Sequence, residues 1–175
     1  MSTLFNRCIS IILRSEGGFQ NNPHDPGNYV DGKLVGTKYG IAAKFFPTED
    51  IENLTLLRAA QLYKTHYWNP MNLEGINSDP LVLQIFDFGV NAGKRTSIKA
   101  IQGIVGVTKD GICGPITKAH INSFKCIEKN DREYCAFDLF KDYRKRYYTN
   151  LANRKPEMKI FLNGWLSRVE NTHFL

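Results

Sequence analysis

The chain has 175 residues, which is the size of one domain or of one domain with a small appendage. Its hydrophobic fraction of 42% is ordinary for a soluble protein, and it has no run of about 18 apolar residues that could cross a membrane. The formal net charge of +6 suits an anionic partner such as nucleic acid, acidic lipid or a cell wall with acidic polymers. Charge alone does not choose among these partners.

An apolar stripe over residues 4–13 opens the chain. Its apolar side chains recur at helical spacing and predict a helix, which two glycines after Glu16 should end. The polar residues Asn6, Arg7 and Ser10 interrupt the run, and no small-residue cleavage site follows it. We therefore expect no signal peptide and synthesis in the cytoplasm, so that action outside the cell would need another route of release.

The stretch from 20 to 40 holds most of the turn-forming residues of the chain. The pair Asp31–Gly32 is a typical two-residue hairpin turn, and short β-prone pairs, Tyr29–Val30 and Leu34–Val35, flank it. The sequence therefore predicts a small β-hairpin directly after the first helix.

Helical patterns follow the hairpin, each with a recognisable start or stop. We expect helices from a Thr55 cap to a stop at Asn69–Pro70, from Asp79–Pro80 onwards, over 96–105, over 115–124, from an Asn130/Glu133 capping-box variant to about 150, and over 157–169 after Pro156. The predicted fold class is α+β, predominantly α, with a small β-hairpin lobe after the first helix.

Four cysteines occur, namely Cys8, Cys113, Cys126 and Cys135, without a CxxC pair and without histidines at ligand spacing. A zinc site is therefore not expected, and we predict buried free thiols, while a disulfide stays open if the protein reaches an oxidising compartment. We expect no metal and no cofactor.

Glu16 stands where an apolar helical run gives way to a polar, turn-rich stretch. The helix dipole disfavours a carboxylate near a helix C-terminus, so its placement there calls for a reason. A glutamate that leaves an apolar helix to face a polar loop is in a setting that favours the protonated form, which a general acid needs. Cleavage of a glycosidic bond usually needs such an acid and a group that holds water or stabilises positive charge.

The strings EGG, NPHDPGN and GTKYGI resemble the catalytic region of glycoside hydrolase family 108, a family of bacterial and phage N-acetylmuramidases. In that family the glutamate of EGG is the catalytic acid, which here falls on Glu16. The chain departs from the family pattern by inserting NYVDGKLVG before Thr37. The spacing from Glu16 to Asp25 is also similar to that of phage-type lysozymes, although Thr37 comes later than in them. The resemblance implies that Asp25 and Thr37 assist Glu16.

A second resemblance covers FDFGVNAGKRTSIKAIQGIVGVTKDGICGPIT, which is similar to a predicted peptidoglycan-binding region, as is the closing GWLSRV. It implies a catalytic muramidase region over 1–80 and a helical peptidoglycan-binding region over 81–175, packed as one compact unit.

Further residues are candidates for contacts with sugar. Tyr39 could line a subsite or pack in the core. Asp87 and Asn91 lie four residues apart on one helical face, and in the family this helix borders the cleft. Trp68 and Trp165 could stack on sugar rings, but core packing is the commoner fate of such residues and is what we expect.

The function implied by the resemblance is that of a lysozyme, which cleaves the β-1,4 bond between N-acetylmuramic acid and N-acetylglucosamine. Three alternatives stay open: a lytic transglycosylase that gives anhydro-sugars, a non-catalytic wall-binding protein, and a nucleic-acid-binding protein, for which no motif is present. We expect a monomer whose partner is the peptidoglycan glycan strand, without integral membrane association. The expected setting is a phage or prophage endolysin, or a secreted wall-lysing effector, that reaches the periplasm through a holin-type release or a secretion system.

Overall fold

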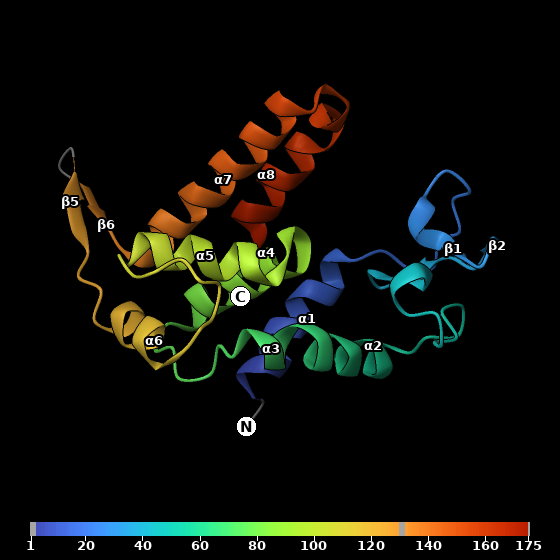
Figure 1. Cartoon of the computed structure of the whole chain (residues 1–175), viewed down its shortest axis with the longest axis horizontal. Coiled ribbons are helices and arrows are strands. Elements are labelled where there is room, and N and C mark those ends of the chain that lie inside the picture. The colour runs from blue at the N-terminus through green and yellow to red at the C-terminus, as the bar shows by residue number, and fades with distance from the viewer. Residues whose placement is uncertain (1–2, 130–131, 175) are drawn as a thin grey trace. The chain divides into compact units, whose positions relative to one another are not determined.

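The computed structural model describes residues 3–129 and 132–174. The chain divides into two compact units, Met1–His66 and Tyr67–Leu175, which we call the N-terminal and the C-terminal unit (Figure 1). Helices dominate, and the strands form three short antiparallel pairs among the described residues. The predicted fold class, α+β and predominantly α, is confirmed.

Helix α1, Leu4–Ser15, forms the apolar base of the N-terminal unit. The Thr3 side chain caps it by accepting the backbone N–H of Asn6 at 3.3 Å. The apolar stripe of α1 buries Phe5, Cys8, Ile9 and Ile12, as its helical spacing predicted. The helix ends at Glu16, whose backbone is extended while its N–H still donates to the carbonyl of Ile12.

The predicted hairpin is present as β1, Tyr29–Val30, paired with β2, Lys33–Leu34. Asp31 and Gly32 form its turn with positive φ values of 47° and 77°. Positive φ at both central residues is what a type I′ turn requires, which explains why Asp-Gly is favoured there. The second strand begins one residue earlier than predicted.

A second hairpin, which the sequence did not predict, follows directly. Strand β3, Thr37–Lys38, pairs with β4, Ile41–Ala42, around a turn formed by Tyr39 and Gly40. Both turn residues again have positive φ, 51° for Tyr39 and 73° for Gly40. A bulky residue rarely takes this backbone conformation, and for that reason the sequence did not indicate a turn here. Two 3₁₀ turns complete this lobe, η1 over Pro26–Asn28 and η2 over Ala43–Phe45.

Helix α2, Leu56–Tyr63, begins at the predicted Thr55 cap, which accepts the N–H of Arg58 at 3.2 Å. The predicted stop at Asn69–Pro70 is wrong. The helix passes through a π-helical turn, η3 over Lys64–Trp68, into α3 over Asn69–Met71, because a proline is tolerated in the first turn of a helix. The helical path ends at Asn72, whose φ of 51° is left-handed.

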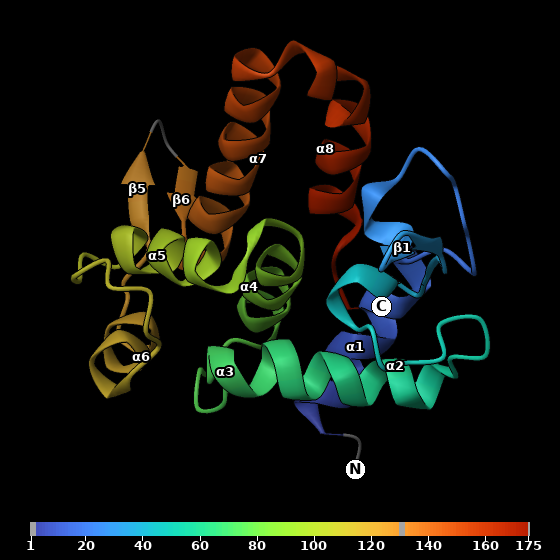
Figure 2. The same cartoon turned by 45° about the vertical axis from the view of Figure 1, so that its right-hand side comes forward.

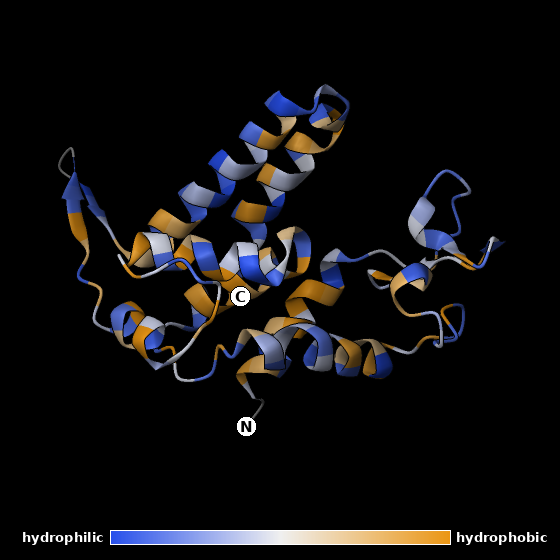
Figure 3. Cartoon of the chain, viewed as in Figure 1, coloured by the Kyte–Doolittle hydropathy of each residue, from blue (hydrophilic) through white to orange (hydrophobic). Residues whose placement is uncertain are grey.

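The C-terminal unit is built around α4, Asp79–Ala92, whose residues from Leu81 to Gly89 are all buried. The remaining helices are α5 over Lys94–Ile104, α6 over Pro115–Asn122, α7 over Ala136–Arg154, the 3₁₀ turn η4 over Pro156–Phe161, and α8 over Leu162–Asn171. Helix α4 packs against α5 and α7 (Figure 2), and the contacts of α7 with α8 pack these two helices together. Figure 3 shows apolar colour on α1 and hydrophilic colour along the outer part of α7.

A third hairpin precedes α7, where the sequence predicted the start of a helix. Strands β5, Ile127–Lys129, and β6, Arg132–Tyr134, pair antiparallel, so Glu133 lies in a strand and does not cap a helix. The other half of that predicted cap, Asn130, lies outside the described residues. Helix α7 is instead capped at Cys135, whose N–H donates to the Asp138 carboxylate at 3.1 Å.

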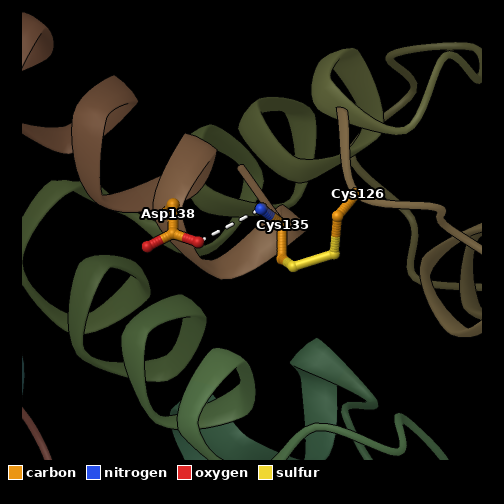
Figure 4. The surroundings of a disulfide bond; sticks show 3 residues. All are labelled: Cys126, Cys135 and Asp138. Carbon is orange, nitrogen blue, oxygen red and sulfur yellow. Dashed lines mark hydrogen bonds between the residues drawn. A yellow bond between two sulfur atoms is a disulfide. The ribbon is translucent and has the colours of Figure 1, made fainter. Parts of the chain in front are cut away.

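A disulfide joins Cys126 and Cys135 across the two ends of the β5–β6 hairpin (Figure 4). The expectation of free thiols is therefore wrong for this pair. It holds for Cys8 and Cys113, which are buried and unbridged. Burial raises the pKa of the Cys113 thiol, which keeps it protonated and unreactive.

Candidate active site

The carboxyl group of Glu16 lies against the turn of the β3–β4 hairpin. Glu16 is half-buried at the C-terminal end of α1. A Cβ atom placed on Gly40 would stand only 2.9 Å from Glu16 Oε2 and 3.1 Å from Cδ. The carboxyl group and the Gly40 backbone therefore approach each other more closely than a side chain at this position would allow.

Backbone pairing ties the segment after Glu16 to the same hairpin. The N–H of Tyr39 donates to the carbonyl of Gly17 at 3.1 Å. Gln20 and Thr37 exchange two backbone hydrogen bonds of 2.9 and 2.8 Å. The chain on the C-terminal side of Glu16 thus runs beside β3, which brings Thr37 and Tyr39 into the same lobe as the glutamate.

The Thr37 hydroxyl is held by Asn28, a residue that sequence reasoning missed. Thr37 Oγ1 donates to Asn28 Oδ1 at 2.7 Å. The Asn28 amide is fully buried and donates to Gln20 Oε1 and to the carbonyl of Asn22, both at 2.9 Å. Because the hydroxyl hydrogen is directed at Asn28, the Thr37 lone pairs remain able to accept a hydrogen bond from water. The signal in the sequence was the turn-forming string DPGN, which ends at Asn28.

Asp25 belongs to the same polar network, and its side chain also caps the 3₁₀ turn η1. Its Oδ1 accepts the N–H of Gly27 at 2.8 Å and thereby caps η1. Its Oδ2 accepts the Gln20 side-chain amide at 3.2 Å, and that amide also donates to Asn28. The structure therefore links Asp25 to Thr37 through two side chains, while the catalytic role of Asp25 stays a prediction.

Asp87, in contrast, is at the centre of the C-terminal unit. Its side chain is 2% exposed and makes ion pairs with Arg144 of α7 and with Arg168 of α8. Two nitrogens of the Arg168 guanidinium lie 2.8 and 2.9 Å from Asp87 Oδ1, and Arg144 donates a hydrogen bond to Asp87 Oδ2. The neighbouring Gln84 accepts from Arg144 and donates to the carbonyl of Thr172 at 2.6 Å. This geometry gives Asp87 a role in joining three helices, and its predicted contact with sugar is untested.

The remaining candidates differ in exposure. Asn91 is exposed, and its amide donates to the carbonyl of Asp87 at 2.8 Å. Tyr39 is half-buried, with the Lys38 ammonium 5.6 Å from the centre of its ring. Trp68 is buried edge-to-face against Phe86, as expected for a core residue.

The second tryptophan, Trp165, is half-buried and stacks on Tyr148 of α7 at 5.1 Å. Burial raises the pKa of the Tyr148 phenol. This pair therefore packs α8 on α7, in agreement with the expected core role.

Within the described part of the chain, no group of three or more His, Cys, Asp or Glu side chains could hold a metal ion. None of the described helices is long and apolar enough to cross a membrane. The site in the N-terminal unit therefore consists of one carboxyl group at a helix end, a hairpin turn and a network of neutral polar side chains with one aspartate.

Residues 9–93 match the family model described as Glycosyl hydrolase 108. This part of the chain belongs to that family. Residues 96–170 match a second model, described as a Predicted Peptidoglycan domain. The glycosyl hydrolase 108 region contains Glu16, Asp25, Thr37, Tyr39, Asp87 and Asn91. The two matches confirm the recognition of both regions and identify the chain as a glycoside hydrolase that acts on peptidoglycan.

Among solved structures, the chain is similar to one described as the structure of Brucella abortus SagA. The TM-score is 0.70 at 24% sequence identity, and the match covers 96% of this chain and 90% of that one. None of the curated proteins matches the sequence. At this identity the structural likeness shows the fold alone.

Proposed function

We propose that the protein is an N-acetylmuramidase that cleaves the β-1,4 bond between N-acetylmuramic acid and N-acetylglucosamine, with Glu16 as general acid. The observation that carries the proposal is the placement of the Glu16 carboxyl group. Glu16 follows the last residue of an apolar helix, and its carboxyl group lies against a hairpin turn inside the glycosyl hydrolase 108 region.

In the proposed reaction Glu16 transfers its proton to the glycosidic oxygen as the bond from that oxygen to the muramic acid C1 breaks. Positive charge develops on the C1–ring-oxygen unit, which the Asp25 carboxylate can stabilise. Water adds at C1 and passes a proton to a carboxylate, either that of Asp25 or that of Glu16, which has just lost its own proton. The Thr37 hydroxyl helps to position the water, since its hydrogen is already donated to Asn28 and its lone pairs can accept a hydrogen bond from the water.

The test of this proposal is Glu16→Gln, which keeps the shape of the side chain but cannot donate a carboxyl proton. We expect lysis of purified cell walls to fall by more than about a hundredfold, with an unchanged circular dichroism spectrum. The matched control is Glu52→Gln, because Glu52 is an exposed glutamate of the same unit. Near-normal clearing of wall suspensions by folded Glu16→Gln would remove Glu16 from the mechanism.

We further propose that the protein acts as a monomer on walls that it reaches after holin-type release or through a secretion system, as a phage endolysin or a secreted effector does. Expression in the bacterial cytoplasm should then leave cells intact, whereas the same chain directed to the periplasm by an added leader should lyse them. Lysis of equal extent without any export route would contradict this part of the proposal.

A further inference from the structure

The end of α2 makes a specific contact with the hairpin turn beside Glu16. Tyr63 is the last residue of α2, and it is 2% exposed. Its hydroxyl donates a hydrogen bond to the backbone carbonyl of Tyr39 at 3.1 Å. A buried phenol needs such a partner, so this hydrogen bond fixes the turn to α2.

Gly40 lies at the point where Tyr63 and Glu16 both approach the turn. A Cβ atom on Gly40 would collide with Tyr63 Oη and would also stand 2.9 Å from Glu16 Oε2. Real Cβ atoms essentially never approach another atom so closely, and Gly40 also has a φ of 73°. A glycine is therefore required here for two separate reasons: its backbone conformation and the closeness of both groups.

Tyr39 is held in an unfavourable conformation from both sides. Its φ of 51° is rare for a bulky side chain. Its N–H bonds to the carbonyl of Gly17, next to Glu16, and its C=O accepts the Tyr63 hydroxyl. Such strain persists only when the surroundings impose it, and it is common at functional sites.

We propose that Tyr63 and Gly40 are positioning residues for the Glu16 carboxyl group. Tyr63 fixes the Tyr39–Gly40 turn to α2. The turn, held in this position, limits where the Glu16 carboxyl group can lie. A general acid must be within hydrogen-bond reach of the oxygen that it protonates, so a displacement of this turn reduces catalysis without removing the acid. This inference rests on the proposed role of Glu16 as general acid.

The first test compares Gly40→Ala with Gly32→Ala. Both glycines are the second residue of a two-residue hairpin turn, with φ of 73° and 77°, so both substitutions impose the same backbone strain. Nothing lies within 4 Å of a Cβ on Gly32, whereas at Gly40 the new methyl group collides with Tyr63 and Glu16. We expect kcat on soluble glycan strands to fall about a hundredfold for Gly40→Ala and to stay close to that of the wild type for Gly32→Ala.

The second test compares Tyr63→Phe with Tyr29→Phe. If Gly40→Ala does not fold, this comparison alone tests the positioning role. Each substitution removes one hydroxyl that donates to a backbone carbonyl, that of Tyr39 at 3.1 Å or that of Pro23 at 3.0 Å. We expect Tyr63→Phe to lower kcat at least about tenfold with KM changed by less than about twofold, because a displaced acid weakens the transition state more than the ground-state complex. Tyr29→Phe should change neither constant.

Equal kcat values for Tyr63→Phe and Tyr29→Phe would overturn the inference, as would a Tyr63→Phe effect confined to KM or to the melting temperature. These outcomes are separate from failure of the proposed function. If Glu16→Gln is inactive while Tyr63→Phe is fully active, the acid is correctly assigned and the positioning role is wrong. If Glu16→Gln is fully active, the acid itself is wrong.

Discussion

The buried ion group at Asp87 allows a sharp test of how the C-terminal unit is held together. Asp87→Asn keeps the shape of the side chain but removes its charge, which leaves Arg144 and Arg168 without their counter-ion. Arg144 is fully buried and Arg168 is 18% exposed, so water can solvate only the second. Breaking a buried pair by removing one partner costs about 3–5 kcal/mol of unfolding free energy.

We expect a loss near the lower end of that range, because Arg144 keeps its bond to Gln84 and lies 5.6 Å from the Phe88 ring centre. For a chain of this length a loss of about 3 kcal/mol corresponds to a fall in Tm of roughly 6–12 °C.

The assay is thermal and urea unfolding followed by circular dichroism, with Asp142→Asn as control. Asp142 is a half-buried carboxylate of α7 whose side chain has no ion pair or hydrogen bond among the described residues. Its substitution should change the unfolding free energy by no more than about 0.5 kcal/mol. If Asp87→Asn is as stable as the wild type and loses glycan binding instead, the structural role is wrong and the contact with sugar predicted from the sequence is right.

Three further predictions concern the rest of the chain. Asp25→Asn and Thr37→Ala should both lower the lysis rate, unequally and by less than Glu16→Gln does; full activity of both in a turbidity assay would remove them from the mechanism. Reduction of the disulfide between Cys126 and Cys135 should destabilise the C-terminal unit by about 2.5 kcal/mol, since the bond closes a loop of about ten residues; an unchanged Tm after treatment with a thiol reductant would contradict this. Hydrogen bonds from two lysines lower the pKa of Glu170 from 4.5 to about 2, so its stabilising effect should be present above about pH 4.5 and lost as the pH falls towards 2. The effect should be small because the carboxylate is half-exposed. It is measured as the difference in unfolding free energy between the wild type and Glu170→Gln, which should disappear as the pH approaches about 2.

The elements predicted correctly from the sequence are those whose cause is local. The first helix follows from the spacing of its apolar residues, and the β1–β2 turn follows from Asp31–Gly32. The start of α2 follows from the Thr55 hydroxyl, which bonds a backbone N–H three residues further on. Each of these elements is determined by residues within one or two turns of the chain, so a single sequence is sufficient to predict it.

The features missed by the sequence depend on partners far along the chain or on local preferences that the fold overrides. Asp87 lies 57 residues from Arg144 and 81 from Arg168, so nothing near it in the sequence indicates its ion pairs. The Tyr39–Gly40 turn forces a tyrosine into a backbone conformation that its side chain disfavours.

The same distinction applies to the candidate active site. Glu16 could be singled out because its unusual position, at the end of an apolar helix and before two glycines, is visible locally. Asn28 could not be singled out, because its role depends on hydrogen bonds to Gln20 and Thr37 that form only in the folded chain. Tyr63 is 24 residues from the carbonyl that it holds, and a tyrosine at the end of a helix is ordinarily a core residue.

The central claim is tested most directly by mass spectrometry of the fragments that the protein releases from purified peptidoglycan, after borohydride reduction of their sugar ends. Wild-type protein should give muropeptides that end in reduced N-acetylmuramic acid, and Glu16→Gln should give none above background. Anhydro-muramic acid ends would show a lytic transglycosylase, and reduced N-acetylglucosamine ends would show cleavage of the other glycosidic bond. Either product, or no fragments at all from folded wild-type protein, would contradict the muramidase assignment.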